Sequence, residues 1–296
     1  MKPVISRRFQ TKAGERTPSI RWALAGLSLS MLLSSLGTSI ANVSLPTLVQ
    51  AFTASFQQVQ WVVLAYLLAV ATLVVSVGRL GDVVGRRRLL LAGIFLFTMA
   101  SVLCGAAPAL WLLIAARAAQ GLGAAIMMAL TIAFVGGTVP SERTGSAMGL
   151  LGSTSAIGTA LGPTLGGVLI AGLGWPAIFL INVPLGLLAL ILAYRYLPID
   201  RQRPNTLRTS FDSMGTFLLA LTLGAYALAM TVGNGNFGLL NITLLLAAFL
   251  GLALFTLAEK KAAAPLLRLA MFRNPLLSSG FAMSALVTTV VMATLV

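Results

Sequence analysis

The fold is decided at Gly78-Arg79-Leu80-Gly81-Asp82-Val83-Val84-Gly85-Arg86-Arg87-Arg88, the one dense cluster of charge between the N-terminal tail and residue 140. An apolar run of about 20 residues flanks this stretch on each side, roughly the length that a helix needs to cross a bilayer. The pattern therefore predicts a short basic loop that joins two membrane-spanning helices.

The composition predicts a membrane protein. Of the 296 residues, 58% are hydrophobic and 9% are charged, which leaves too little polar surface to coat a soluble globule, whereas lipid covers apolar helix faces. The net charge of +14 is confined to short segments, which argues against nucleic-acid binding. The chain has no His and a single Cys, Cys104, so His-based catalysis, Cys/His metal sites and intrachain disulfides are excluded. We expect no enzyme, no metal and no cofactor.

Nine apolar runs predict an all-α polytopic membrane protein. The first, 22–45, is too long for a signal-peptide core and is followed by more spans. The expected domains are a basic cytoplasmic tail (1–21), a six-helix unit (22–197), a cytoplasmic linker (198–213), a helix pair (214–257), a cytoplasmic loop (258–275) and one further helix (276–296). The spans are expected at 22–45, 59–78, 89–107, 110–135, 146–173, 178–197, 214–232, 239–257 and 276–296.

Loop charges predict the orientation. With the N-terminus inside, the external turns contain no Lys, Arg, Asp or Glu; these turns are 46–58, 105–109, 173–177 and 233–238. All of the 20 basic residues except Arg117 then fall on the cytoplasmic side, as the positive-inside rule requires. The expected location is a cell membrane, the plasma or inner membrane of a bacterium, with a cytoplasmic N-terminus.

The charged stretch is also a candidate gate. Asp82 can pair with the nearby arginines and with helix ends, forming an ionic latch that opens only when these pairs break. Positive charge that only anchors the topology is the alternative, and it does not explain Asp82. The latch residues are Gly78, Arg79, Gly81, Asp82, Gly85, Arg86 and Arg87.

The pattern of this stretch, G-R-L-G-D-x-x-G-R-R-R, resembles the loop between the second and third helices of major facilitator superfamily transporters. Two more segments resemble the 14-helix drug:proton antiporters of that superfamily: Gln60-Trp61-Val62-Val63-x-x-Tyr66, and Gly174 to Gly186, which departs from the pattern at Pro176 and Ala177. The resemblance implies the N-terminal portion of such a protein: a six-helix half, the extra central helix pair and the first helix of an incomplete second half. It also implies that the aspartate holds the outward-open state.

Arg117 is the one charge well inside an expected span, where it costs about 2.5 to 3.5 kcal/mol and marks a functional site by default. Small or polar residues recur on its face of the helix, namely Gln120, Gly121, Ala124, Met128 and Thr131. The alternative is that Arg117 extends to the outer interface. The segment is similar to the R-x-x-Q-G motif of facilitator antiporters, which implies proton coupling by Arg117, Gln120 and Gly121.

The span 146–173 is rich in small residues. Gly158, Gly162 and Gly166 share one face and predict close approach of another helix, and Pro163 removes the hydrogen bond to the Thr159 carbonyl and predicts a kink. Gly158-x-x-x-Gly162-Pro163-x-x-Gly166-Gly167 also resembles the antiporter motif of exporters, which implies export rather than uptake.

Polar residues of the first span either line a cavity or bond to another helix. The proposed cavity residues are Ser35, Ser39, Asn42, Trp61, Tyr66 and Met128. The first span also resembles the antiporter signature L-D-x-T-I-V-N-V-A-L-P, but Gly37 stands at its acidic position, which puts cation recognition and carboxylate-based proton coupling in doubt.

The expected function is secondary transport by alternating access, with proton-coupled efflux of drugs or small amphipathic compounds as the main hypothesis. An uptake carrier or lipid translocator of the same fold, and a non-transporting partial membrane protein, are the alternatives. The expected partners are a small-molecule substrate, protons and the bilayer, and the expected state is a monomer. The sequence does not identify the substrate, because the apolar and aromatic walls of such pockets are common to any helix bundle.

Overall fold

A computed structural model describes residues 20–139, 141–198, 213–231, 238–261, 278–280, 282, 283 and 286. Within these ranges the regular structure is entirely helical, and the helices are long because the sequence alternates apolar runs with short turns. They are α1 (Ile20–Val43), α2 (Leu45–Phe52), α3 (Phe56–Val84), α4 (Arg86–Gly105), α5 (Leu110–Thr138), α6 (Ser141–Leu173), α7 (Ala177–Leu180), α8 (Asn182–Tyr196), α9 (Ser213–Thr231) and α10 (Leu239–Lys261).

Eight helical segments of the described part are long and apolar enough to cross a membrane, with α7 and α8 counted as one. They match the first eight predicted spans in order. The N-terminal tail, most of the linker 198–213, the loop 258–275 and nearly all of the ninth span lie outside the described residues.

The charged stretch differs from the predicted loop. α3 continues as a helix through Val84, and Gly85 alone separates it from α4. Gly85 has a φ of 104°, a left-handed backbone region that residues with a Cβ adopt only at a cost, whereas glycine enters it freely. One glycine therefore takes the place of the predicted loop. It turns the chain between α3 and α4, and both helices continue up to it.

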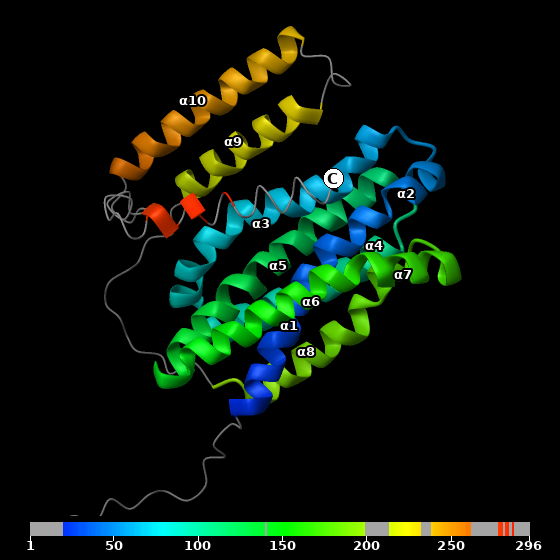
Figure 1. Ribbon diagram of the computed structural model, residues 1–296. Helices are drawn as coiled ribbons and strands as arrows, with labels where there is room; N and C mark the ends of the chain where they lie inside the picture. Colours follow the sequence, from blue (N-terminus) through cyan, green and yellow to red (C-terminus); the bar gives the residue numbers. More distant parts are fainter. Residues whose placement is uncertain are drawn as a thin grey trace, which may run out of the picture.

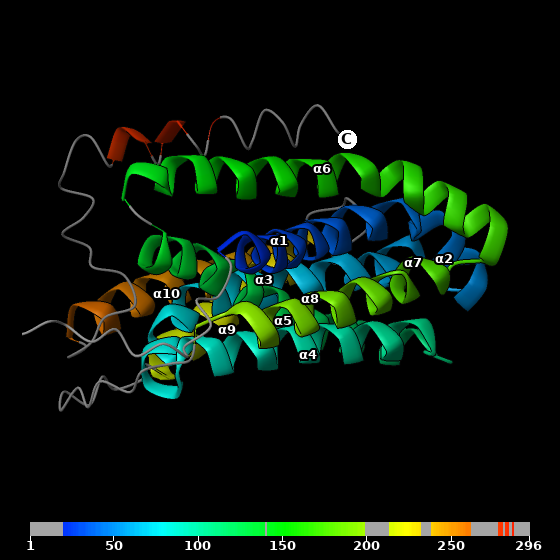
Figure 2. The ribbon, with the colours of Figure 1, turned by 90° about the horizontal axis from the view of Figure 1, so that it is seen from below.

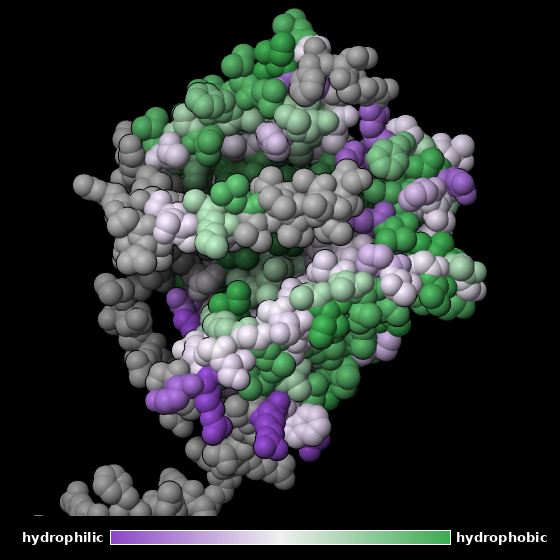
Figure 3. Space-filling view, viewed as in Figure 1, coloured by the Kyte–Doolittle hydropathy of each residue, from purple (hydrophilic) through white to green (hydrophobic). Residues whose placement is uncertain are grey.

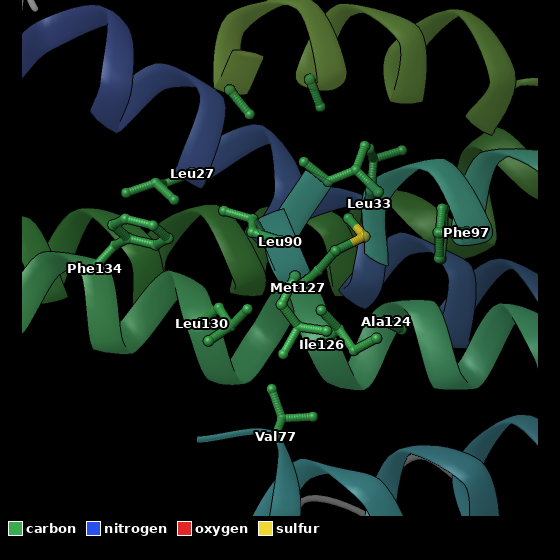
Figure 4. Packing of buried hydrophobic residues seen from close by; sticks show 14 of the residues in the cluster. Leu27, Leu33, Val77, Leu90, Phe97, Ala124, Ile126, Met127, Leu130 and Phe134 are labelled. Carbon is green, nitrogen blue, oxygen red and sulfur yellow. The ribbon is translucent and has the colours of Figure 1, made fainter. Parts of the chain in front are cut away.

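The core of the bundle lies around α5. This helix packs against α3 and α4 and also contacts α1, while α8 packs against α1 and α4. Figure 4 shows apolar side chains of these helices meeting, with Leu33 of α1, Leu90 of α4 and Met127 of α5 close together; all three are fully buried. Interdigitated packing of this kind holds membrane helices together, since lipid supplies no hydrophobic drive between them.

α6 lies at the edge of the bundle, beside α1 (Figure 2). It packs on α1 and has few other neighbours. α9 and α10 form a separate antiparallel pair (Figure 1), which contacts the bundle through α9 and α3. A hydrogen bond of 2.8 Å between the Ser76 and Thr216 hydroxyls joins these two helices.

The surface agrees with a membrane environment. On the face that Figure 3 shows, the strongly hydrophilic residues gather toward the two ends of the helices, and the helix flanks between them are mostly hydrophobic. Exposed leucines and isoleucines continue along these flanks, for example Ile191 at 60% and Leu246 at 63% exposure. Side chains of this kind are stable in contact with lipid tails.

Candidate functional site

Arg117 lies on α5 in the interior of the bundle with 0% of its surface exposed. Its Nε donates a hydrogen bond of 3.0 Å to the backbone carbonyl of Val62 on α3, and its Nη1 donates one of 2.6 Å to Oε1 of Gln120, one turn further along α5. The alternative in which Arg117 reaches the membrane surface is therefore wrong, because its guanidinium is held between two helices at the depth of the core.

Aromatic rings cover the faces of the Arg117 guanidinium. Its Cζ lies 4.2 Å from the ring centre of Tyr66 on α3 and 5.8 Å from that of Phe179 on α7. The Tyr66 hydroxyl donates a bond of 2.8 Å to the Ser34 carbonyl of α1, which fixes the ring in place. Cation–π contacts of desolvated groups contribute about 2 kcal/mol, so the rings offset much of the cost of the buried charge.

Gln120 extends the polar contacts of Arg117 toward α4. Its Nε2 donates a hydrogen bond of 2.7 Å to the Ser101 hydroxyl, and Ser101 in turn donates one of 2.7 Å to the Phe97 carbonyl. Both Gln120 and Ser101 are fully buried. The amide is thus oriented at both ends, with its oxygen toward Arg117 and its nitrogen toward α4.

Two glycines of α5 bring these helices close enough for the contacts to form. A Cβ on Gly121 would lie 2.5 Å from the Tyr66 carbonyl oxygen, and one on Gly123 would lie 2.7 Å from the Phe97 backbone nitrogen. Any larger residue would push α3 or α4 away. Gly121 therefore serves the site by sterics, since it lets Tyr66 approach α5.

One donor of the Arg117 guanidinium remains available. Nη2 is buried and has no hydrogen-bond partner among the described residues. A buried, unsatisfied donor costs about 1 to 3 kcal/mol, more when it is charged, and such a group is stabilised by an acceptor that enters the site. The contacts of Arg117 within the described part of the chain thus leave one of its donors unused.

The seam between α1 and α6 contains the glycine motif. A Cβ on Gly158 would lie 2.8 Å from the Leu32 carbonyl oxygen, and one on Gly166 would lie 3.0 Å from the Ile40 side chain. The hydroxyls of Ser35 and Ser155 share a hydrogen bond of 2.6 Å across the seam. The predicted close approach is confirmed, and its partner is the first helix.

Pro163 has a partner across the same seam. The proline ring removes the N–H that would bond to the Thr159 carbonyl, and the Ser39 hydroxyl donates a hydrogen bond of 2.7 Å to that oxygen. The backbone acceptor that the proline leaves unpaired is thus satisfied by α1. Neighbouring hydroxyls commonly stabilise prolines in membrane helices in this way.

A matched pair of glycines tests the seam. A Cβ on Gly162 would lie 2.9 Å from the Ile40 backbone nitrogen and would also contact Ser39, whereas a Cβ on Gly167 would meet nothing within 4 Å. Gly162→Ala should lower the free energy of unfolding by about 1–3 kcal/mol because of overpacking. Gly167→Ala should leave it unchanged or raise it by up to about 1 kcal/mol, since alanine favours a helix. Thermal unfolding in detergent measures both, and equal stabilities would contradict the close seam.

An ion pair joins two residues of the latch stretch. Nη2 of Arg86 lies 3.0 Å from Oδ1 of Asp82, one helical turn apart across Gly85, with 43% and 53% of the two side chains exposed. Arg87 instead donates to the Tyr194 carbonyl at the end of α8. Gly81 packs against α5, where a Cβ would lie 2.9 Å from Leu130, and Gly78 has open space around it. Nothing is described of the Arg79 side chain.

The bundle combines a charged α3–α4 turn, a buried arginine on α5 and a glycine–proline helix packed against α1. The sequence of residues 27–296 matches the family model of the Major Facilitator Superfamily. The chain belongs to the Major Facilitator Superfamily.

Relatives within the superfamily include several drug-resistance proteins. The chain is 36% identical over 262 residues to the multidrug resistance protein Stp of Mycobacterium tuberculosis, covering 88% of this chain and 48% of that protein. It is 37% identical over 251 residues to the riboflavin transporter RibZ of Clostridioides difficile, covering 84% and 53%. It is 34% identical over 259 residues to the tetracenomycin C resistance and export protein of Streptomyces glaucescens, covering 87% and 48%. The chain thus spans about half the length of these relatives.

Solved superfamily structures share the fold. A bacterial homologue of the human lysosomal transporter Spinster, inward-facing and occupied, aligns with a TM-score of 0.56 at 19% identity, covering 84% of this chain and 63% of that one. A D-xylose–proton symporter aligns with a TM-score of 0.52 at 16% identity, covering 80% and 67%. The predicted fold class, an all-α major facilitator membrane protein, is confirmed.

The proposed cavity residues do not share one accessible surface. Tyr66 is 1% exposed beneath Arg117, and Ser35 and Ser39, each 9% exposed, are bonded to α6. These two serines therefore follow the alternative in which hydroxyls bond across helices. Asn42 is exposed, and Trp61 and Met128 are half-buried, so these three remain predictions for a substrate surface.

Sequence reasoning missed several residues that support the Arg117 site. Ser101 and Asn182 are polar residues inside apolar spans, which is a signal that could have indicated them. Asn182 is fully buried, and its amide bonds to the carbonyls of Ile178 and Phe179 at 3.3 Å, which stabilises the joint between α7 and α8 where Phe179 faces Arg117. The Val62 carbonyl gave no signal, because every residue has one.

Proposed function

We propose that this superfamily member is part of a secondary transporter that exports drugs or small amphipathic compounds by alternating access. The observation that carries this proposal is the α1–α6 seam, in which Gly162 gives a contact at backbone distance and Ser39 bonds to the carbonyl that Pro163 leaves unpaired. This segment resembles the exporter motif. The names of the relatives, multidrug resistance, and tetracenomycin C resistance and export, support the same direction.

Protons are the proposed coupling ion, with Arg117 as the coupling residue. Asp82 and Glu142 stand at helix ends, so the middle of the described spans contains no carboxylate. Without a carboxylate, the Nη2 donor of Arg117 provides a place for a water molecule or a substrate oxygen. Gln120 and Gly121 act with Arg117, the first by holding the guanidinium and the second by admitting Tyr66.

Gly37 indicates which compounds the transporter takes. A Cβ there would lie 3.4 Å from the Phe97 ring and 3.7 Å from the Tyr66 hydroxyl, so an acidic residue would place its charge beside Tyr66 and near Arg117. Glycine leaves Arg117 as the dominant charge at this depth. We therefore propose neutral or anionic amphipathic substrates rather than cations, because an unpaired buried cation repels a second one.

The proposed setting of the protein is a bacterial membrane. The protein is a monomer in a bacterial plasma or inner membrane, with a cytoplasmic N-terminus, as the loop charges favour. The α3–α4 turn is the latch on the cytoplasmic face. The similarity to a riboflavin transporter supports a metabolite carrier of the same fold as the second candidate.

Transport in membrane vesicles of both orientations tests this function. Riboflavin, which is fluorescent, and a radiolabelled tetracenomycin are suitable probes, since relatives are named for these compounds. An exporter should accumulate one of them in energised inside-out vesicles, and a protonophore should abolish the accumulation. Vesicles without the protein are the control.

The two vesicle orientations separate the alternatives. Accumulation only in right-side-out vesicles would show an uptake carrier and would contradict export. Transport that survives the protonophore would contradict proton coupling. Absence of movement in both orientations, for these and other neutral or anionic amphipathic probes, would favour the non-transporting alternative.

A further inference from the structure

Arginines and aromatic rings gather where α1 begins, α4 begins and α8 ends. Trp22 stacks on Tyr196 with ring centres 5.9 Å apart, and Arg195 lies over the same tyrosine at 5.9 Å. Arg87 of α4 lies 5.3 Å from the Tyr194 ring centre and donates to the Tyr194 carbonyl. We name this group the arginine–aromatic cluster; it consists of Trp22, Arg87, Tyr194, Arg195 and Tyr196, together with Arg21, which precedes Trp22 in the chain.

Helix packing brings these residues to one end of the bundle. Gly26 of α1 packs on α8, where a Cβ would lie 3.1 Å from the Leu192 Cβ, and Figure 1 shows the start of α1 and the end of α8 together. The cluster is thus part of the packed bundle on the side of α1 that faces α8, whereas the seam with α6 lies further along α1. It is separate from Arg117, which is buried deep in α5.

The cluster has an excess of positive charge. Three of its six residues are arginines and none is acidic, and the nearby Asp82 is bonded to Arg86. Two of the arginines, Arg21 and Arg195, are exposed. Arg87 stands in the first turn of α4, where the helix dipole disfavours a cation. Charges placed in this way are stabilised by an anion.

The cluster lies at the boundary of the membrane. Three candidate spans end at this level, Arg21–Val43, Arg86–Gly105 and Ala177–Tyr196. Trp22 and Tyr194 are 53% and 68% exposed, as expected for aromatic side chains at the level of lipid headgroups. Below Tyr194, exposed apolar residues continue along one face of α8 at helical spacing, Leu187 and Ile191.

We propose that the arginine–aromatic cluster binds the phosphate headgroup of an anionic phospholipid. The exposed guanidiniums of Arg21 and Arg195 bind phosphate oxygens, for which arginine is well suited. Trp22 and Tyr194 pack on the glycerol region, and the acyl chains follow the α8 face at Leu187 and Ile191. A free phosphate ion would use the arginines alone and would leave this apolar face unexplained.

Lipid binding to the purified protein tests the proposal. Native mass spectrometry counts bound dioleoylphosphatidylglycerol against dioleoylphosphatidylcholine, and thermal unfolding measures the stabilisation that each lipid gives. The wild type should retain the anionic lipid preferentially. Arg21→Gln combined with Arg195→Gln should weaken its binding about thirtyfold, since each interfacial arginine contributes about 1 kcal/mol.

Matched variants make the result specific. Arg143→Gln removes an exposed arginine from the start of α6 and should keep the preference, and Arg21→Lys with Arg195→Lys should retain most of it. Equal retention of both lipids by the wild type would overturn the proposal, as would equal losses in Arg143→Gln and the double variant. Full stabilisation by inorganic phosphate would identify a free-anion site and would likewise overturn it. Unfolding temperatures in the neutral lipid alone control for misfolding.

Discussion

Replacing Arg117 by glutamine is expected to reduce transport to the level of empty vesicles while leaving the fold about as stable as before. The buried cation costs about 2.5 to 3.5 kcal/mol, and its bonds to Val62 and Gln120 with the Tyr66 ring offset a similar amount. Removing the charge and its contacts together therefore changes the free energy of unfolding little. We therefore expect Arg117 to serve transport rather than stability.

Transport and thermal unfolding of the same preparation measure this prediction. Arg117→Lys should lose most of the transport, because an ammonium cannot hold Val62 and Gln120 in the planar geometry of a guanidinium. Arg143→Gln, the same chemical change at an exposed site, should transport normally. Normal transport by Arg117→Gln would remove Arg117 from the mechanism.

Replacing Asp82 by asparagine is the second change with a large expected effect. The Asp82–Arg86 pair is exposed and contributes only about 0.3 to 0.5 kcal/mol to stability, so Asp82→Asn should insert and fold normally. Transport should nevertheless be abolished, because the aspartate is proposed to change partners when the halves rock. A weak pair suits this role, since a latch must release easily.

The partner variants separate a latch from a simple anchor. Asp82→Glu keeps the charge and should keep partial transport, whereas Arg86→Gln removes one of several neighbouring cations and should reduce transport less than Asp82→Asn. Vesicle transport and membrane abundance are the measurements. If Asp82→Asn transports at the wild-type rate, positive charge that anchors the topology is a sufficient account of this turn.

Much of the fold could be predicted because membranes simplify the problem. A span needs about 20 apolar residues, so the order and approximate ends of eight helices followed from the sequence. Helical spacing also placed Arg117 and Gln120 on a buried face, which the structure confirms. The Gly85 turn was predicted as a longer loop, since charge ended the apolar run before the helix itself ended.

The details of the site could not be predicted, because they depend on how neighbouring helices are rotated and shifted along each other. Spacing within one helix did not indicate that Tyr66 covers Arg117 or that Ser39 meets the Thr159 carbonyl. Ser35 and Ser39 were assigned to a cavity for the same reason. The polar side chains of Ser35 and Ser39 indicated that both residues point into the protein rather than toward lipid. Only the packing of α1 on α6 shows which atoms they contact.

Cysteine labelling shows which turns of the chain lie on which side of the membrane, and the roles assigned above depend on that topology. Cys104 is fully buried, so single cysteines can be added at exposed sites with little background. In intact cells, a membrane-impermeant maleimide should label Gln50→Cys and Ala106→Cys, and should label Ser146→Cys only after permeabilisation. Labelling of Ser146→Cys in intact cells, with protection of the other two, would contradict the orientation and the roles assigned from it.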